Sequence, residues 1–358
     1  MTGEVLSRRA LNRSLLARQH LLERCALPLP VAVEQVGGLQ TQYAPAGYIG
    51  LWSRLAGLSR DELTGALFDR SVVQGTLMRS TIHMVSATDY WRLAGGIREG
   101  RRAWFLRTHA RPAGGIDMEA VARAIRGLLA DGPRRRSELV RALDEAGFPA
   151  VAWSGAGLWV DMVRVPPSGT WERRRADLFG LAEAWVGPDD AIPEAGVASG
   201  ENAAALSHLV RRYLGGFGPA TLNDVAGWAG LNPGDLRPAV AALDLRQYRD
   251  EEGRCLLDLH DAPLPDPETP APVRFLPVWD ATLLVHARRT QILPEEFRNR
   301  VFDTKRPQSV NTFLVDGSVT GSWRSDGGHI AIEPFRRIPR TVRRELDAEA
   351  ERLAAFSA

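Results

Sequence analysis

Two glutamines stand one residue apart in the segment Val36-Gly37-Gly38-Leu39-Gln40-Thr41-Gln42, directly after a Gly-Gly step. Side-chain amides donate and accept hydrogen bonds, but they neither titrate nor act as strong nucleophiles. If Gln40 and Gln42 take part in a reaction, their substrate must already carry a bond that is primed to break. In an extended or loop segment, residues two apart face the same side, so both amides could point into one space. A purely structural role, in which the amides cap nearby backbone groups, stays open at this point.

Two runs of three arginines are the clearest candidates for binding an anion. They are Arg134-Arg135-Arg136 and Arg173-Arg174-Arg175. Because the formal net charge of the chain is only +2, a polyanion would have to be bound by such local clusters rather than by a general positive field. The guanidinium group suits phosphate because it presents a planar fork of donors. The alternative is a solvated basic face without a ligand.

The remaining reactive side chains are isolated along the chain. His83 stands between Ile82 and Met84 in an expected strand, where a lone histidine is more often structural than catalytic. Histidines, cysteines and carboxylates nowhere show the spacing of a metal site, so neither a metal nor a cofactor is predicted. Two cysteines, Cys25 and Cys255, are too few for a disulfide framework or a thiolate zinc site.

Length and hydropathy set the class of protein. A chain of 358 residues can form two or three domains with a sizeable core. No apolar run approaches the roughly 20 residues that a membrane-spanning helix needs, and the N-terminus shows no apolar segment of signal-peptide length. We therefore expect a cytoplasmic protein, associated with the nucleoid if it binds DNA, without a membrane partner.

Helical and strand-like patterns alternate along the chain. Apolar residues at helical spacing predict helices, and β-formers broken by turn residues predict hairpins. The expected helices are 6–24, one that begins near 31, 52–68 capped by Ser59, 116–129, 138–146 capped by Ser137, 204–213, 222–229, 233–245 and 336–356. The expected strands and hairpins are 72–86, 153–165 and 169–186 on either side of a turn at 166–169, 274–288 and 312–323.

Helices followed by an apolar hairpin form the pattern of a winged helix, and this pattern occurs three times. It predicts an α+β fold of three tandem winged-helix units. The first unit covers residues 1–112 and contains the two glutamines, the second covers 113–198, and the third, which is more β-rich and ends in a helix, covers 199–358.

Two local signals accompany this pattern. A fragment of Gly, a hydroxyl residue, a bulky apolar residue and Arg begins at Gly75, Gly169 and, one residue shorter, at Gly321. It suggests an equivalent strand in each unit. The dipeptide Asp316-Gly317, between alternating apolar residues, predicts a type I′ hairpin turn.

Four segments together resemble a known family. The segments are Gly38-Leu39-Gln40-Thr41-Gln42, Leu51-Trp52-Ser53-Arg54, Arg79-Ser80-Thr81-Ile82-His83-Met84-Val85-Ser86, and Val315-Asp316-Gly317 through Gly321-Ser322-Trp323-Arg324. They are similar to the AlkZ-type bacterial winged-helix DNA glycosylases, and the resemblance runs from Leu6 to Phe356. It implies three tandem winged-helix units that form a concave DNA-binding surface. Members of the family excise bulky N7-alkylguanines or unhook interstrand crosslinks, often protecting a producer from its own genotoxic metabolite.

The resemblance also implies roles for individual residues. The Gln-x-Gln catalytic motif of the family falls on Gln40 and Gln42, with Thr41 at a middle position that is frequently apolar in the family. Arg79 and His83 lie in a matching segment and become candidates on the DNA side.

The DNA-probing hairpin of the family corresponds to the region 312–323, next to which Trp323 and Arg324 could reach the minor groove, where arginine inserts readily. A core position is the alternative for Trp323. The arginine runs would contact phosphates.

The implied partner is double-stranded DNA that carries alkylated purines, bound by a monomer without a metal or cofactor. The rival hypothesis is a non-catalytic winged-helix DNA-binding protein or transcription regulator, since the winged helix is mostly a binding scaffold. The sequence shows no heptad helix for dimerisation and no ligand-sensing segment, which such a regulator would be expected to have.

Overall fold

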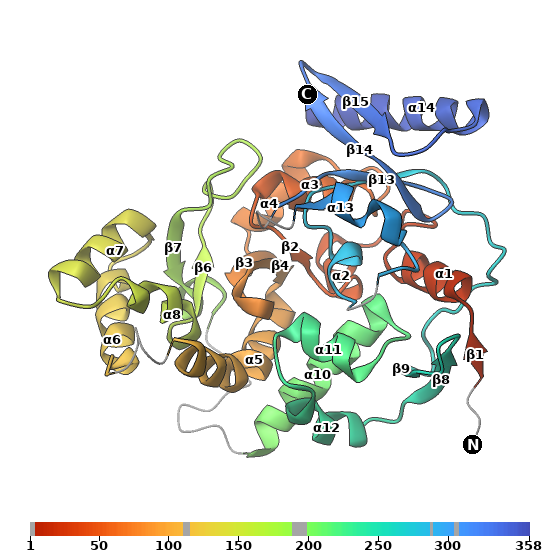
Figure 1. Ribbon diagram of the computed structural model, residues 1–358. Coiled ribbons are helices and arrows are strands. Elements are labelled where there is room, and N and C mark those ends of the chain that lie inside the picture. The colour runs from red at the N-terminus through yellow and green to blue at the C-terminus, as the bar shows by residue number, and fades with distance from the viewer. Residues whose placement is uncertain (1–3, 110–114, 188–198, 287–288, 304–307) are drawn as a thin grey trace.

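The structure is a computed structural model, and it describes residues 4–109, 115–187, 199–286, 289–303 and 308–358. The fold is mixed α+β, as predicted. Figure 1 shows the second unit in yellow, the third in green and a C-terminal lobe in blue, arranged around the first unit in red and orange. The sequence of residues 187–200 predicts a linker, and this region lies mostly outside the described residues.

One antiparallel sheet joins the first two units. Its strand order is β2-β4-β3-β6-β7-β5. The strands are β2 (Leu39–Gln40), β3 (Val72–Thr76), β4 (Ile82–Ser86), β5 (Arg134–Arg135), β6 (Met162–Arg164) and β7 (Leu178–Leu181). The units meet where β3 pairs with β6, through Gln74 with Arg164 and Gly75 with Val163.

Each half of this sheet follows the same chain order of helix, edge strand, helices and hairpin. In the first unit the helices are α2 (Leu29–Gln35), α3 (Ala44–Trp52) and α4 (Arg60–Phe68). In the second they are α6 (Met118–Leu129), α7 (Arg136–Glu145) and α8 (Val151–Trp159). The long α5 (Ala87–Thr108) connects the units, and α9 (Ala182–Trp185) follows β7.

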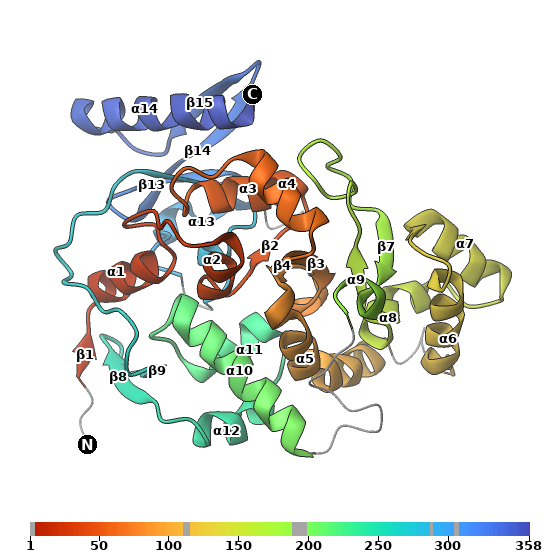
Figure 2. The same ribbon diagram turned by 180° about the vertical axis from the view of Figure 1, so that it is seen from behind.

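The third unit repeats the order with a reduced edge strand. Its helices are α10 (Ser199–Phe217), α11 (Leu222–Ala229) and α12 (Pro233–Ala241), followed by the hairpin β8 (Arg246–Asp250) and β9 (Cys255–Asp258). A single bridge from Ala220 to Leu257 stands in place of the edge strand. On the other side β1 (Val5–Leu6) pairs in parallel with β8, as Figure 2 shows from behind. The helix α1 (Arg8–Arg18) follows β1.

A C-terminal lobe completes the molecule. Its sheet has the order β10-β13-β14-β15. The elements are β10 (Arg274–Leu276), β13 (Thr312–Val315), β14 (Ser318–Asp326), β15 (His329–Pro334) and the helix α14 (Arg340–Ser357). Shorter pieces between them are α13 (Arg298–Val301), β11 (Phe302–Asp303), β12 (Gln308–Ser309) and the 3₁₀ turns η2 (Ala281–Leu283) and η3 (Glu295–Phe297). Asp316 and Gly317 have φ of 46° and 76°, as a type I′ turn requires.

Several expectations from the sequence were wrong. The helices α3, α5 and α8 were not predicted, and residues 153–159 of the expected hairpin segment 153–165 lie in α8. Helix α7 is capped at Arg135, whose backbone N–H donates to Glu138, rather than at Ser137. The expected strand 274–288 ends at Leu276 because the chain then turns through Trp279, whose φ is 60°. The shared glycine fragment marks no equivalent strand: Gly75 lies in β3, whereas Gly169 lies in the loop after β6.

Buried ion pairs connect the lobe and the third unit to the N-terminal helices. Arg54, which follows α3, holds both carboxylate oxygens of Asp280 at 2.9 and 3.0 Å, and both side chains are 2% exposed. Arg18 of α1 similarly holds Asp258 of β9 at 2.6 and 2.8 Å. Apolar contacts also join the first unit to the lobe, because Tyr48 of α3 lies in the same core cluster as residues of β10 and β13. The first unit is therefore packed firmly against the lobe.

Replacing Asp280 with alanine should leave the Arg54 guanidinium buried without its counter-charge. Breaking a buried pair in this way costs about 3–5 kcal/mol, and we expect the free energy of unfolding in urea to fall by that amount. As a control, Asp347→Ala removes a half-exposed partner of Arg343 and should cost less than about 1 kcal/mol. Equal losses in the two variants would contradict the proposed contribution of the buried pair.

Candidate active site

The Gly-Gly step places the two glutamines on the edge of the first unit's sheet. Gly37 and Gly38 have φ of 75° and 77°, so the chain leaves α2 through two left-handed residues. A Cβ on Gly38 would lie 3.0 Å from a methyl group of Val85, which leaves little room for another residue. The chain then enters β2, where Gln40 pairs with His83 of β4.

The two amides lie together. Gln40 Nε2 donates a hydrogen bond to Gln42 Oε1 at 3.0 Å. Gln40 is 8% exposed, whereas Gln42 is exposed at the surface. Thr41 between them is fully buried and directs its side chain the other way, toward Gly47 of α3. The nearly buried Gln40 therefore supports Gln42, and Gln42 faces solvent.

Arg79 fixes the orientation of both amides. It lies in the turn between β3 and β4 with φ of 55°, and its guanidinium donates to Gln40 Oε1 and to the backbone carbonyl of Trp228, each at 2.8 Å. A guanidinium can only donate, so the oxygen of Gln40 must face Arg79 and its nitrogen must face Gln42. The oxygen of Gln42 keeps one lone pair for a further hydrogen bond.

The electrostatic character of this group is cationic. Burial, and the positive charge of Arg101 nearby, lower the pKa of Arg79 to about 10, which leaves it charged at neutral pH. Arg101 is held by the Ser80 hydroxyl at 2.7 Å and by the carbonyl of Gly230 at 3.2 Å. No carboxylate is a hydrogen-bond or ion-pair partner of these arginines or of the two glutamines within the described residues. The group therefore offers no acid that could protonate a substrate.

His83 lies behind the motif rather than at the surface. It is 2% exposed, and its Nδ1 lies 3.1 Å from the carbonyl oxygen of Thr81, which places the proton on Nδ1. Burial lowers the pKa of His83 to about 3. A neutral, enclosed imidazole packs against β2 but presents no group to DNA, so we assign it a structural place.

The predicted arginines of the second unit are exposed, but they differ in their partners. Arg134 donates to the carbonyl of Leu128, Arg135 lies 3.4 Å from Asp177, and Arg136 stacks over Trp153. Of the second run, Arg173 is exposed at the surface, Arg174 donates to the hydroxyl of Tyr43 at 3.2 Å, and the side chain of Arg175 is 90% exposed. Of the six arginines, Arg174 is thus the one that contacts the residue next to Gln42.

The two candidates in the C-terminal lobe, Trp323 and Arg324, differ in exposure. Trp323 is 5% exposed and donates from its indole nitrogen to the carbonyl of Leu276, so it is a core residue and not a DNA contact. The side chain of Arg324 is 70% exposed. Sequence reasoning missed Tyr43 and the Trp228 carbonyl as neighbours of the motif, since nothing in the sequence connects these segments.

The described ranges contain no group of three or more histidine, cysteine, aspartate or glutamate side chains that could hold a metal ion. Among the same residues, no helix is both long and apolar enough to cross a membrane.

Comparison with known proteins identifies the class. A family model described as "DNA glycosylase AlkZ-like" matches residues 33–356, which is nearly the whole chain and includes the two glutamines. The protein is therefore a DNA glycosylase.

More specifically, the chain belongs to the AlkZ-like family. Among solved structures it is similar to Streptomyces sahachiroi DNA glycosylase AlkZ, with a TM-score of 0.78 and 20% sequence identity over 99% of this chain and 97% of that chain. At this identity the likeness shows a shared fold. A comparison with curated protein sequences gives no match.

The imidazole of His83 should stay neutral from about pH 5 to 8. Its folded pKa of about 3 lies below the roughly 6.5 of an unfolded chain. The unfolded state therefore binds the extra proton first, and this residue lowers stability as the pH falls from about 6.5 toward 3. Histidine ring NMR signals, assigned by their loss in His83→Asn, test the expectation. A midpoint above pH 5 for that signal would refute it.

Proposed function

We propose that the protein hydrolyses the N-glycosidic bond of cationic N7-alkylguanine, or a related alkylpurine, in double-stranded DNA. The observation that carries the proposal is the amide pair held by Arg79 without an acid beside it. Such a group cannot help a neutral base to leave, so it suits a base that departs unaided.

The chemistry of the lesion supplies what the site lacks. Alkylation at N7 gives the guanine a positive charge, and when the bond from C1′ to N9 breaks, N9 takes the electron pair and the base leaves neutral. The sugar passes through an oxocarbenium-like state, as in glycoside hydrolysis generally. A water oxygen then bonds to C1′ and loses a proton to solvent. What remains for the protein is to hold the water and to stabilise the developing positive charge with fixed dipoles.

The geometry supports a division of roles between the glutamines. Gln42 is exposed and its oxygen keeps a free lone pair, which suits a hydrogen bond from the attacking water. Gln40 is nearly buried and has its oxygen engaged by Arg79, so it orients Gln42 and supports the sugar or the water. We assign Arg79 to this positioning, in place of the direct DNA contact predicted from the sequence.

The free hairpin of the C-terminal lobe is the candidate to probe DNA. The turn of the region 312–323 is docked on α1, because Asp316 pairs with Arg9 at 3.0 Å and with Arg13. The next hairpin, β14–β15, instead ends in an exposed turn at Gly327 and Gly328. We propose that this turn, with Arg324 beside it, reaches the DNA.

The open position of Gln42 favours lesions that are too bulky to enter a closed pocket. Interstrand crosslinks are the extreme case, because a base joined to both strands resists extrusion. Activity on such lesions would begin base-excision repair or protect the producer of a DNA-alkylating natural product.

Replacing Gln42 with alanine should lower single-turnover release of N7-methylguanine from duplex DNA by roughly 100-fold, the usual effect of losing one fixed polar group at a reacting centre. Gln40→Ala should also lower it, because Gln42 loses its support. Affinity for the same duplex, measured by fluorescence polarisation, should stay near the parental value.

Gln247→Ala is the matched control, since it removes an exposed amide on β8 in the third unit. The parental protein should leave unmodified guanine in place, because its site supplies no acid. Parental excision rates in both motif variants would disprove the catalytic assignment. DNA binding without any base release from the parental protein would disprove the proposed substrate.

Arg79→Lys tests the positioning role. A lysine keeps the positive charge but cannot bind the Gln40 oxygen and the Trp228 carbonyl with two parallel donors. We expect excision to slow by roughly 10- to 100-fold, as misplaced groups typically cause, while DNA affinity and melting temperature change little. If binding weakens and excision at saturating protein does not slow, Arg79 contacts DNA instead.

A further inference from the structure

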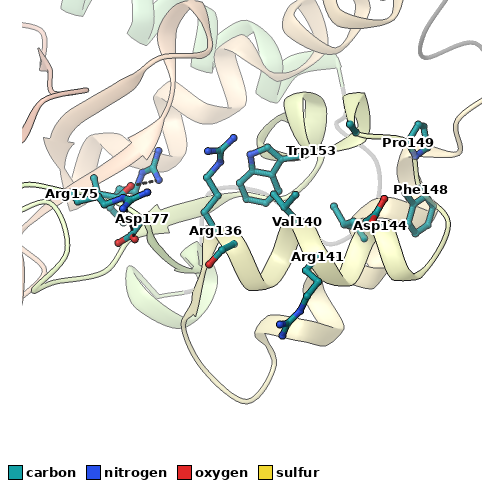
Figure 3. A pocket seen from close by; sticks show the side chains of 14 residues that line it. Arg136, Val140, Arg141, Asp144, Phe148, Pro149, Trp153, Arg175 and Asp177 are labelled. Atoms are coloured by element: carbon teal, nitrogen blue, oxygen red, sulfur yellow. Dashed lines mark hydrogen bonds and ion pairs between the residues drawn. The ribbon is translucent and has the colours of Figure 1, made fainter.

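The second unit contains a pocket of about 770 Å³ that has no role in the chemistry above. It lies between α7, the first turn of α8 and the loop from β6 to β7, and Figure 3 shows its lining side chains. Four arginines and two aspartates line it. Arg136, Arg164 and Arg175 come from three different parts of the unit, and Trp153 also lines the pocket.

The pocket lies next to the end of β5, the edge strand of the second unit, which is the counterpart of β2 in the first unit. Leu39 pairs with Met84 and Met84 with Gln74, just as Arg134 pairs with Phe179 and Phe179 with Arg164.

At the seam, Gln74 and Arg164 pair with each other, so a pseudo-twofold axis relates the two halves of the sheet. Gln40, Thr41 and Gln42 then correspond to Arg135, Arg136 and Ser137. The last two of these line the pocket, whereas Arg135, the counterpart of Gln40, does not. The same edge of the same module is neutral and polar in one unit and cationic in the other.

Charge is poorly compensated at this edge. In the described part of the chain, no hydrogen bond or ion pair joins the Arg136 side chain to another residue; it only stacks over Trp153 at 5.9 Å. Of the two aspartates that line the pocket, Asp177 is shared by Arg135 at 3.4 Å and Arg175 at 3.6 Å. Burial and the charge of Arg136 lower the pKa of Arg164 to about 10. An anion between these guanidinium groups would relieve their repulsion.

The form of the pocket favours a phosphate over a nucleobase. The guanidinium carbon of Arg136 lies 5.9 Å from the centre of the Trp153 ring, and Phe179 packs against the same ring at an interplanar angle of 87° with centroids 5.5 Å apart. Two neighbours therefore already compete for the aromatic surface that a base would need for stacking. Figure 3 shows Arg141 extending from the other side of α7, and this residue pairs with Glu145 at 3.7 Å. The guanidinium groups of Arg136 and Arg175 remain as donors, and both are exposed.

We propose that this pocket seats a backbone phosphate of the DNA duplex, bound by Arg136 and Arg175 in front of Arg164. The second unit thereby anchors the duplex, while the first unit carries the reaction. The inference rests on the proposed function for the identity of its DNA partner, but it does not depend on which lesion is excised.

The test is binding of an undamaged fluorescent duplex of about 20 base pairs by the full-length protein, measured by polarisation over a range of KCl concentrations. Arg136→Ala and Arg175→Ala should each weaken binding about 10-fold, as loss of a charge-assisted hydrogen bond does. Each should also reduce the slope of log affinity against log salt by about 0.9, the value for one phosphate contact. Arg136→Gln, which keeps the length of the side chain, should behave like Arg136→Ala.

Arg123→Ala is the matched control, because it removes another exposed arginine, on α6 of the same unit, and should leave affinity and slope unchanged. A duplex with single neutral methylphosphonates should show one position that weakens the parental protein but not Arg136→Ala. Parental affinity and slope in both pocket variants would overturn the proposal. So would binding of inorganic phosphate at Arg136 that leaves DNA affinity untouched in the variants.

This design distinguishes a failure of the anchoring proposal from a failure of the proposed function. Undamaged DNA contains no lesion, so its binding does not depend on excision. A parental protein that releases no N7-methylguanine but shows the Arg136 effect would refute the substrate and leave the anchoring site standing.

Discussion

A guanidinium group that can only donate is the constraint on which the candidate site depends. Arg79 gives one donor to the oxygen of Gln40 and another to the carbonyl of Trp228, which belongs to the third unit. The first bond fixes the orientation of both amides. The second makes that orientation depend on the position of α11, the helix that contains Trp228. The orientation of the motif is therefore a property of two packed units and not of the short strand that bears it.

The packing of the units makes such a long-range constraint workable. One core cluster contains Val85 of the first unit together with Phe217 and Trp228 of the third, so the two units cannot shift past each other without opening a cavity. The second unit has its own cluster around Val121 and Phe179. It joins the first through a seam of two paired residues on each strand, in addition to contacts from α5. The motif thus lies where the first and third units share one core cluster.

Much of this arrangement could be predicted from the sequence. Periodicity located the hairpin over residues 72–86, the winged-helix order and the type I′ turn at Asp316 and Gly317. The spacing of Gln40 and Gln42 correctly suggested that the amides share one space. These features depend on local signals such as alternation, glycine and turn residues, which a single sequence contains.

The missing parts depend on contacts between distant residues. The segment after Leu276 has strand-forming residues, yet Asp280 is held by Arg54, 226 positions away, and the chain turns to meet it. Helix α3 begins Ala-Pro-Ala-Gly, so helix propensity does not predict it. All of its residues are buried, and this burial decides its form. No pattern in the sequence indicates that Arg79 adopts a left-handed conformation or that its partner is a carbonyl of another unit.

The pseudo-twofold relation between the first two units has a consequence for how this architecture diversifies. Two copies of one module, joined edge to edge, can change independently, because a substitution on the cationic edge does not touch the amide edge. Exchange of residues 118–181 between family members would also replace Trp171, which packs against Tyr48 of the first unit with ring centroids 5.6 Å apart, so a chimera would have to keep this contact.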